Sequence, residues 1–138
     1  MTDAPETKHV TLRWLDNLRF EGGEVNGPQV LIDADNVDAP GPMLQVLLAA
    51  AACAGADVVS ILKKMQVDLE SIEMTMSGKR RADHPKRYTA IHYVWVIRGK
   101  GLDETKARRA IDLSLEKYCS VVHSLAPDIV TSYDLTLG

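Results

Sequence analysis

The chain has 138 residues, of which 46% are hydrophobic and 25% charged, as expected for a single globular domain spanning residues 1–138. Its formal net charge is −3, so the sequence predicts no basic surface for nucleic acid. Residues 1–8 are polar and acidic and lack the basic and apolar regions of a targeting segment, which favours a cytoplasmic protein.

The first third of the chain predicts three short strands. Residues 8–14 alternate apolar and polar side chains, a pattern typical of a half-buried strand. Residues 19–22 and 30–32 predict two more strands, with glycine- and asparagine-containing turns around them. A polar connection over residues 33–41 then ends in Pro-Gly-Pro.

A helix is predicted from Met43 to Met65, with Gly55 as a candidate kink. Its apolar character runs nearly all round, which indicates a helix buried inside a soluble protein. A membrane span is not expected, because prolines open the segment and its middle is mostly alanine.

The remainder of the chain predicts two strands, an amphipathic helix and a last strand. The strands cover residues 67–77 and 88–98, and the second places Ile91, Tyr93, Trp95 and Ile97 on one face, with both faces partly covered. The helix starts near Asp103, keeps one apolar face as far as Val122 and stops at Pro127, before a strand over residues 129–137. Strands grouped in runs favour an α+β fold with an antiparallel sheet.

Two cysteines are the main candidates for chemistry. Cys53 lies in the apolar helix and Cys119 near the end of the amphipathic one, where each is either an inert core thiol or a reactive group. Cys119 and His123 have a spacing that can hold a metal with Cys53, but no fourth ligand presents itself, so neither a metal nor a cofactor is predicted. Ser60 and Ser120 have no identifiable base, which disfavours a hydrolase.

The contexts of both cysteines resemble the signatures of the OsmC/Ohr family, in particular its OsmC-like branch. The matching stretches are Pro40-Gly41-Pro42-Met43, Leu47-Leu48-Ala49-Ala50 with Cys53, residues 57–65, Leu115-Glu116-Lys117-Tyr118-Cys119-Ser120-Val121, and the opening strands between residues 10 and 22. The resemblance covers nearly the whole chain. It implies an OsmC-like fold, an antiparallel sheet packed on a buried central helix, in an intertwined homodimer.

The resemblance also implies a thiol-dependent peroxidase that removes organic hydroperoxides in oxidative stress. Cys53 would attack the peroxide, Cys119 would resolve the resulting sulfenate as a disulfide, and a dithiol would reduce that disulfide. Arg19 occupies the place of the family's catalytic arginine, with Arg13 as the substitute candidate. Asp57 matches the branch pattern and is interpreted as structural, capping or bridging near Gly55.

One departure weakens the peroxidase interpretation. The family usually has a glutamate that orients the arginine, but the sequence here offers Leu44 and Gln45. Gln45 can hydrogen-bond a guanidinium without charge, or Arg19 is held by Glu21 or Glu24. The alternatives are a redox-responsive or small-ligand-binding protein with little turnover, and a structural dimer with inert thiols.

Overall fold

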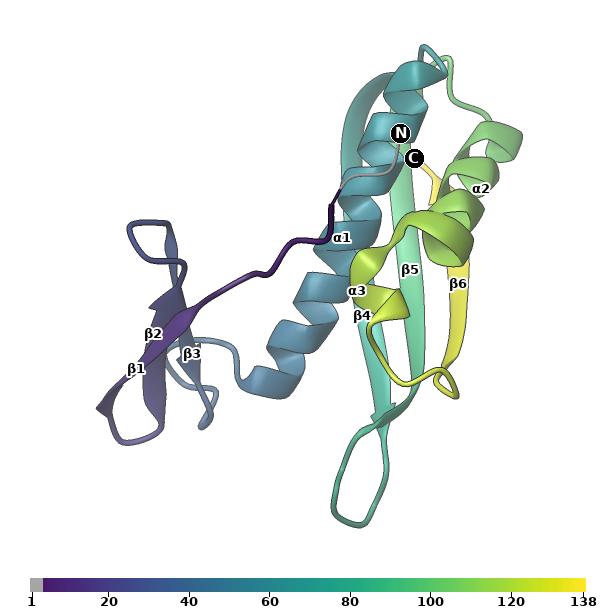
Figure 1. Cartoon of the computed structure of the whole chain (residues 1–138). Coiled ribbons are helices and arrows are strands. Elements are labelled where there is room, and N and C mark those ends of the chain that lie inside the picture. Colours follow the sequence, from purple (N-terminus) through teal and green to yellow (C-terminus); the bar gives the residue numbers. More distant parts are fainter. Residues whose placement is uncertain (1–3) are drawn as a thin grey trace. The chain divides into compact units, whose positions relative to one another are not determined.

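The computed structural model describes residues 4–138. They form two compact units that divide between Gln45 and Val46, and each unit is described by itself (Figure 1). The prediction of a single domain over residues 1–138 stays a prediction. Residues 1–3, the start of the predicted polar segment, lie outside the described residues.

The N-terminal unit is an antiparallel meander of three strands in the order β1-β2-β3. The strands are β1 (Thr11–Asp16), β2 (Arg19–Gly23) and β3 (Gln29–Asp33), which confirms all three predicted strands. Asn17 and Asn26 take positive φ angles in the two turns, a conformation that asparagine tolerates better than most residues. The predicted half-burial of the first strand is wrong for the described chain, because every residue of β1 is exposed.

The helix α1 (Pro42–Lys64) confirms the predicted long helix and runs through the division between the units. It is helical through Gly55, so the candidate kink there does not interrupt the helix. A Cβ atom at Gly55 would lie 3.4 Å from Met74 Sδ on the next strand, which is an ordinary van der Waals contact.

The prediction that α1 is buried holds for one face only. Its buried residues are Leu47, Ala50, Ala51, Ala54, Val58 and Leu62. On other faces Leu48 and Val59 are 53% and 43% exposed. By length and composition α1 could also cross a membrane, but the core helix of a soluble protein passes the same test.

The C-terminal unit contains a second sheet in the order β4-β5-β6, formed by β4 (Asp68–Arg80), β5 (Tyr88–Lys100) and β6 (Val130–Leu137). β4 and β5 are antiparallel, whereas β6 runs parallel to β5. The predicted antiparallel sheet is therefore wrong at β6. The helices between β5 and β6 carry the chain back to the start of β5, and such a crossover gives parallel strands.

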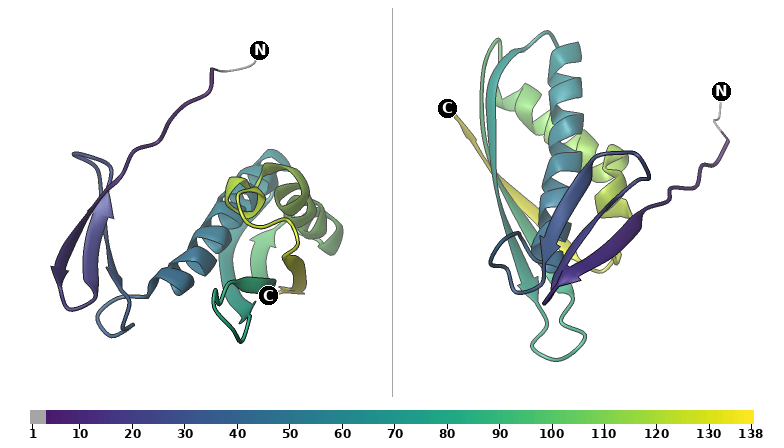
Figure 2. Two further views of the ribbon diagram at one scale, coloured as in Figure 1. Left: turned by 60° about the horizontal axis from the view of Figure 1, so that its bottom comes forward. Right: turned by 90° about the vertical axis from the view of Figure 1, so that its left-hand side faces the viewer.

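The core of this unit lies between the sheet and the helices, which cover one face of it (Figures 1 and 2). Its strand contribution is the predicted face of β5, which is confirmed as buried: Ile91, Tyr93, Trp95 and Ile97. The helix α2 (Glu104–Leu113) adds Ala107, Ala110 and Ile111. On the other face of β5, His92, Val94 and Val96 are only partly buried.

The predicted amphipathic helix begins as expected but is interrupted before Val122. Asp103 caps α2, and its carboxylate accepts a hydrogen bond from Lys106 N at 2.8 Å. A five-residue π-helix, η1 (Ser114–Tyr118), then follows, and after Cys119 a short helix, α3 (Ser120–His123), ends the run. The interruption sets the position of Cys119.

Candidate functional site

The two cysteines come together inside the C-terminal unit. The thiol sulfurs of Cys53 and Cys119 and a carboxylate oxygen of Asp57 all lie within 4.8 Å of one another. α1 supplies Cys53 and Asp57, which are one helical turn apart and therefore share a face. The junction of η1 and α3 supplies Cys119 from far along the sequence. We call these three side chains the cysteine cluster.

Local backbone geometry explains how Cys119 enters the core. Its N–H donates to the carbonyl of Ser114, five residues earlier, at 2.7 Å, the hydrogen bond that defines a π turn. Cys119 itself is extended, with φ −71° and ψ 99°, so it separates η1 from α3. The side chain is 0% exposed as a result.

The two thiols differ in their surroundings. Burial raises the pKa of Cys119, and the neighbouring Cys53 raises it further, whereas the backbone N–H groups of Val122 and Val121 act in the opposite direction. Cys53 is only partly buried. Neither sulfur forms a disulfide bond. Cys53 is the thiol that a solute reaches more easily.

Asp57 links α1 to η1. The hydroxyl of Ser114, which is buried, donates to Asp57 Oδ2 at 2.9 Å. The bridging role predicted for Asp57 is therefore confirmed, although its partner lies in η1 rather than at Gly55. The same carboxylate belongs to the cysteine cluster. Helical spacing predicts that Asp57 lies near Cys53, but it does not predict that Asp57 also lies near Cys119.

A buried phenol adjoins this region. Tyr93 is 0% exposed, and its hydroxyl has no hydrogen-bond partner among residues 4–138. Burial raises its pKa, and negative charge on Cys119 or Cys53 raises it further. The sequence indicated that Tyr93 belongs to the core, but it gave no sign that the hydroxyl is unpaired.

Arg19 lies in the N-terminal unit and is held by two carboxylates that the sequence interpretation did not name. Its guanidinium hydrogen-bonds Asp16 and Asp38, and these contacts raise its pKa. The expectation that Glu21 holds Arg19 is wrong, because Glu21 pairs with Arg13. The ion pairs described for Arg19 do not include Glu24 either.

The amide of Gln45 does not take the place of the missing glutamate. Its Nε2 donates to the backbone carbonyls of Leu31 and Pro40, at 3.3 and 3.4 Å. The loop that presents Asp38 is instead organised by Asp33, whose buried carboxylate accepts hydrogen bonds from the backbone N–H groups of residues 35, 37 and 38. These hydrogen bonds lower the pKa of Asp33.

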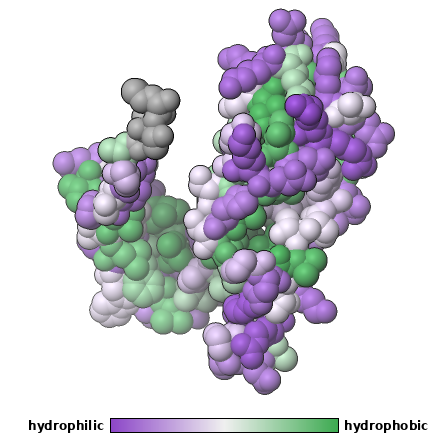
Figure 3. Space-filling model, turned by 45° about the vertical axis from the view of Figure 1, so that its right-hand side comes forward, coloured by the Kyte–Doolittle hydropathy of each residue, from purple (hydrophilic) through white to green (hydrophobic). Residues whose placement is uncertain are grey.

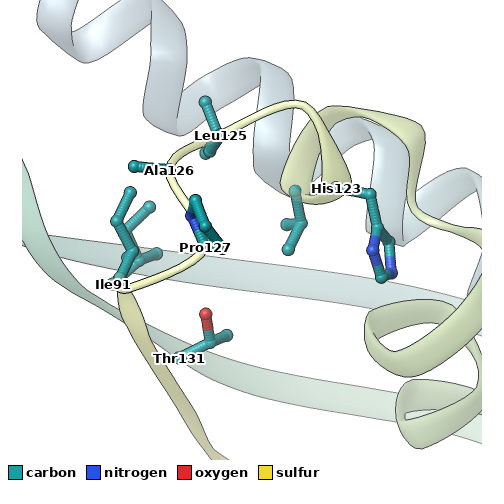
Figure 4. A pocket seen from close by; sticks show the side chains of 8 residues that line it. Ile91, His123, Leu125, Ala126, Pro127 and Thr131 are labelled. Carbon is teal, nitrogen blue, oxygen red and sulfur yellow. The ribbon is translucent and has the colours of Figure 1, made fainter.

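His123 does not join the cysteine cluster among the described residues, so the metal pair considered for Cys119 and His123 gains no support. His123 lines a cavity of about 270 Å³ between β5, α3 and the start of β6 (Figure 4). The cavity is mostly apolar, and its lining includes Ile91, Leu125 and Pro127 but neither cysteine.

Sequence reasoning also missed a hydrogen-bonded group of three side chains, His92, Ser132 and Asp134, on the outer face of the sheet. His92 contacts Ser132 through Nδ1 at 2.7 Å and Asp134 through Nε2 at 3.1 Å. The pairing of β5 with β6 explains it, since His92 lies opposite Ser132 in the ladder. Ser132 and Asp134 are exposed, so this group has no enclosed site around it.

Comparisons with known proteins agree with this fold. Residues 34–134 match the family model of the OsmC-like proteins. Protein YhfA of Escherichia coli (strain K12) is 39% identical over 127 residues, covering 90% of this chain and 95% of YhfA.

Two solved structures illustrate the range of the likeness. The crystal structure of a hypothetical protein from Aquifex aeolicus VF5 has a TM-score of 0.83 and 31% identity, covering 97% of this chain and 99% of that one. An organic hydroperoxide resistance protein OsmC from Legionella pneumophila has the same fold at a TM-score of 0.67 and 14% identity, covering 97% of this chain and 99% of that one. The chain belongs to the OsmC-like protein family.

Proposed function

We propose that this protein is a thiol-dependent peroxidase that reduces organic hydroperoxides, with Cys53 as nucleophile and Cys119 as resolving thiol. The observation that carries the proposal is the proximity of the two sulfurs, which lie within 4.8 Å although they come from α1 and from the end of η1. Two thiols this close can form a disulfide after a modest side-chain movement.

The reaction proceeds in three balanced steps. The Cys53 thiolate attacks one peroxide oxygen, the O–O bond breaks, and with one proton the products are an alcohol and a Cys53 sulfenic acid. The Cys119 thiol then attacks the sulfenic sulfur, which forms the disulfide and releases water. A dithiol reductant returns both cysteines to thiols by exchange and is itself oxidised.

The surroundings of the two thiols support this division of roles. Cys53 is partly exposed, so a peroxide from solution can reach it. Cys119 is buried and its pKa is raised, which keeps it as a protonated thiol until a sulfenic acid forms next to it. The reverse assignment would require the peroxide to reach the buried sulfur first.

Arg19 is the proposed cation for the Cys53 thiolate. Its ion pairs with Asp16 and Asp38 hold the guanidinium in a fixed orientation, the task that a glutamate near Leu44 would perform in the family pattern. On this proposal the absent glutamate is replaced by carboxylates of the same unit. Arg13 is the weaker candidate, because its side chain is 64% exposed.

The substrate class and the assembly are also proposals. The name of the Legionella pneumophila protein refers to organic hydroperoxide resistance, which favours alkyl hydroperoxides here. The apolar residues exposed on α1 favour a homodimer that covers them. A cytoplasmic location, without nucleic acid or membrane as partner, is part of the same proposal, since reduction of the Cys53–Cys119 disulfide by a dithiol needs a reducing compartment.

Peroxide consumption in the presence of a dithiol tests the proposal. We expect Cys53→Ser to abolish consumption of an alkyl hydroperoxide, and Cys119→Ser to retain a single stoichiometric oxidation of Cys53. Ser60→Ala, an exposed substitution on the same helix, is the control for α1 and should leave the rate unchanged. After one equivalent of peroxide, the wild type should yield a peptide that links Cys53 to Cys119. Equal residual turnover in both cysteine variants would exclude these roles.

A second candidate function is a redox-responsive or ligand-binding protein with little turnover. The observation that favours it is that no glutamate orients the arginine, since the amide of Gln45 donates to the backbone carbonyls of Leu31 and Pro40 instead. The same peroxide assay separates the candidates. A sensor forms the Cys53–Cys119 disulfide once per chain, whereas a peroxidase consumes peroxide for as long as the dithiol lasts.

A further inference from the structure

The cysteine cluster contains one more side chain than a disulfide requires. Its third member is the carboxylate of Asp57, and the ligand atoms of Cys53, Asp57 and Cys119 lie within 4.8 Å of one another. Zinc binds thiolate sulfur at about 2.3 Å and carboxylate oxygen at about 2.0–2.2 Å, so ligand atoms in a tetrahedral site are roughly 3.3–3.8 Å apart. Small side-chain movements would bring all three around one ion.

We infer that Cys53, Asp57 and Cys119 form a binding site for a thiophilic divalent cation, with Zn²⁺ as the ion that the ligand set fits best. Two thiolates and one carboxylate provide three protein ligands and leave the fourth position open to water or a small ligand. This inference does not rest on the proposed peroxidase activity. It assigns the same thiols a second state, in which a bound ion prevents their oxidation to a disulfide.

One of the ligands, Asp57, is already held in place by a hydrogen bond. The Ser114 hydroxyl donates to Asp57 Oδ2 at 2.9 Å, the kind of outer contact that orients a metal-binding carboxylate. A disulfide needs neither the carboxylate nor its Ser114 contact, whereas a metal site uses both.

The site is also close to a polar group that lacks a partner. The hydroxyl of Tyr93 is buried and makes no hydrogen bond to any residue between 4 and 138, and the charges of both sulfurs act on it. A water molecule in the open fourth position of the ion would offer such a hydroxyl an acceptor. Binding moves no electrons: each thiol loses one proton as its sulfur binds the cation, so two protons are released per ion.

Titration of the reduced protein with Co²⁺ under anaerobic conditions, followed by displacement with Zn²⁺, tests the site without any peroxide. We expect one ion per chain, thiolate-to-cobalt charge-transfer absorption, and release of two protons. Cys53→Ser and Cys119→Ser should each remove most of this absorption. Asp57→Asn should weaken binding by at least about tenfold, because even outer contacts of metal ligands commonly contribute that much.

Asp112→Asn is the matched control. Asp112 also accepts a hydrogen bond from a hydroxyl, that of Tyr133 at 2.8 Å, but it lies outside the cysteine cluster. Its substitution should leave the affinity unchanged. The inference would be overturned if the wild type bound the ion no more tightly than a variant in which both Cys53 and Cys119 are replaced by Ser. An equal loss of affinity in Asp57→Asn and Asp112→Asn would also overturn it. If Asp57→Asn does not fold, X-ray absorption of the wild-type zinc complex decides between two sulfur neighbours, as expected, and four, which would mean an ion shared between chains.

Failure of this inference and failure of the peroxidase proposal are distinguishable. A protein that binds no metal but forms the Cys53–Cys119 disulfide contradicts only the metal site. A protein that binds one ion per chain but consumes no peroxide contradicts only the peroxidase.

Discussion

At the scale of single residues, burial assigns different properties to chemically similar groups. Cys53 and Cys119 are both thiols, but only Cys119 is fully buried, with a raised pKa. Tyr93 and Tyr133 are both phenols, and only Tyr133 has a described hydrogen-bond acceptor, Asp112. A buried hydroxyl without a partner loses its hydration and gains nothing in return, so it destabilises the folded state.

This contrast predicts opposite effects for two conservative substitutions. Tyr93→Phe should raise the free energy of unfolding by about 1 kcal/mol, because it removes an unpaired buried hydroxyl. Tyr133→Phe should lower it by about 1 kcal/mol, because it leaves Asp112 without its donor. Urea unfolding at one fixed protein concentration measures both, and a destabilised Tyr93→Phe variant would show that its hydroxyl has a partner.

Tyr93 also predicts how the free energy of unfolding depends on pH. Because the pKa of Tyr93 is raised in the folded state, the unfolded chain loses the phenol proton first as the pH rises above about 10. Ionisation of this group therefore leaves the free energy of unfolding unchanged below about pH 10 and lowers it as the pH rises further. We expect the alkaline loss of stability to be smaller in Tyr93→Phe than in the wild type.

At the scale of elements, the π-helix η1 determines whether the two thiols meet. A π turn holds one more residue than an α turn, so η1 shifts the register of everything after it. Side chains one residue apart on a helix differ by about 100° in direction. Without the extra residue, Cys119 would point away from the position it now occupies.

Deletion of one residue in η1 tests this interpretation. Removing Lys117, which is exposed, should convert the π turn to an α turn and keep most of the helical content, measured by circular dichroism. The peroxide-induced link between Cys53 and Cys119 should then be lost in peptide mapping. Lys117→Ala, which keeps the number of residues, is the control and should form the link normally. A link in the deletion variant would show that η1 does not position Cys119.

At the scale of the whole molecule, the described chain exposes large apolar side chains on several elements, β1 and α1 among them. On β1, Leu12 and Trp14 are 56% and 66% exposed, and on α1 Leu48 is 53% exposed. Figure 3 shows hydrophobic side chains at the surface of the molecule. Exposed apolar surface of this kind is typical of an interface, and a second copy of the chain is the partner that the homodimer proposal names.

Substitution of Leu48 tests the dimer. Leu48→Glu should weaken self-association by at least about tenfold, because it would place an unpaired charge in an apolar interface. Light scattering over a concentration series measures the change. Val37→Glu is the control, since Val37 is 79% exposed but lies in the loop after β3 rather than on α1 or β1. A wild type that is monomeric at all concentrations would exclude the homodimer.

The sequence by itself determined the family and most of the elements, but not the interruption of the second helix by η1. The alternation of apolar and polar residues in β5 and the sequences around the two cysteines are local patterns. Such patterns can be recognised without knowledge of the fold. Only the tertiary structure decided which distant segments and side chains are in contact. The parallel pairing of β6, the partners of Arg19 and the third member of the cysteine cluster, Asp57, all depend on contacts between distant segments. The spacing of apolar residues along the sequence does not predict such contacts, because burial and strand register arise only when separate elements pack against one another.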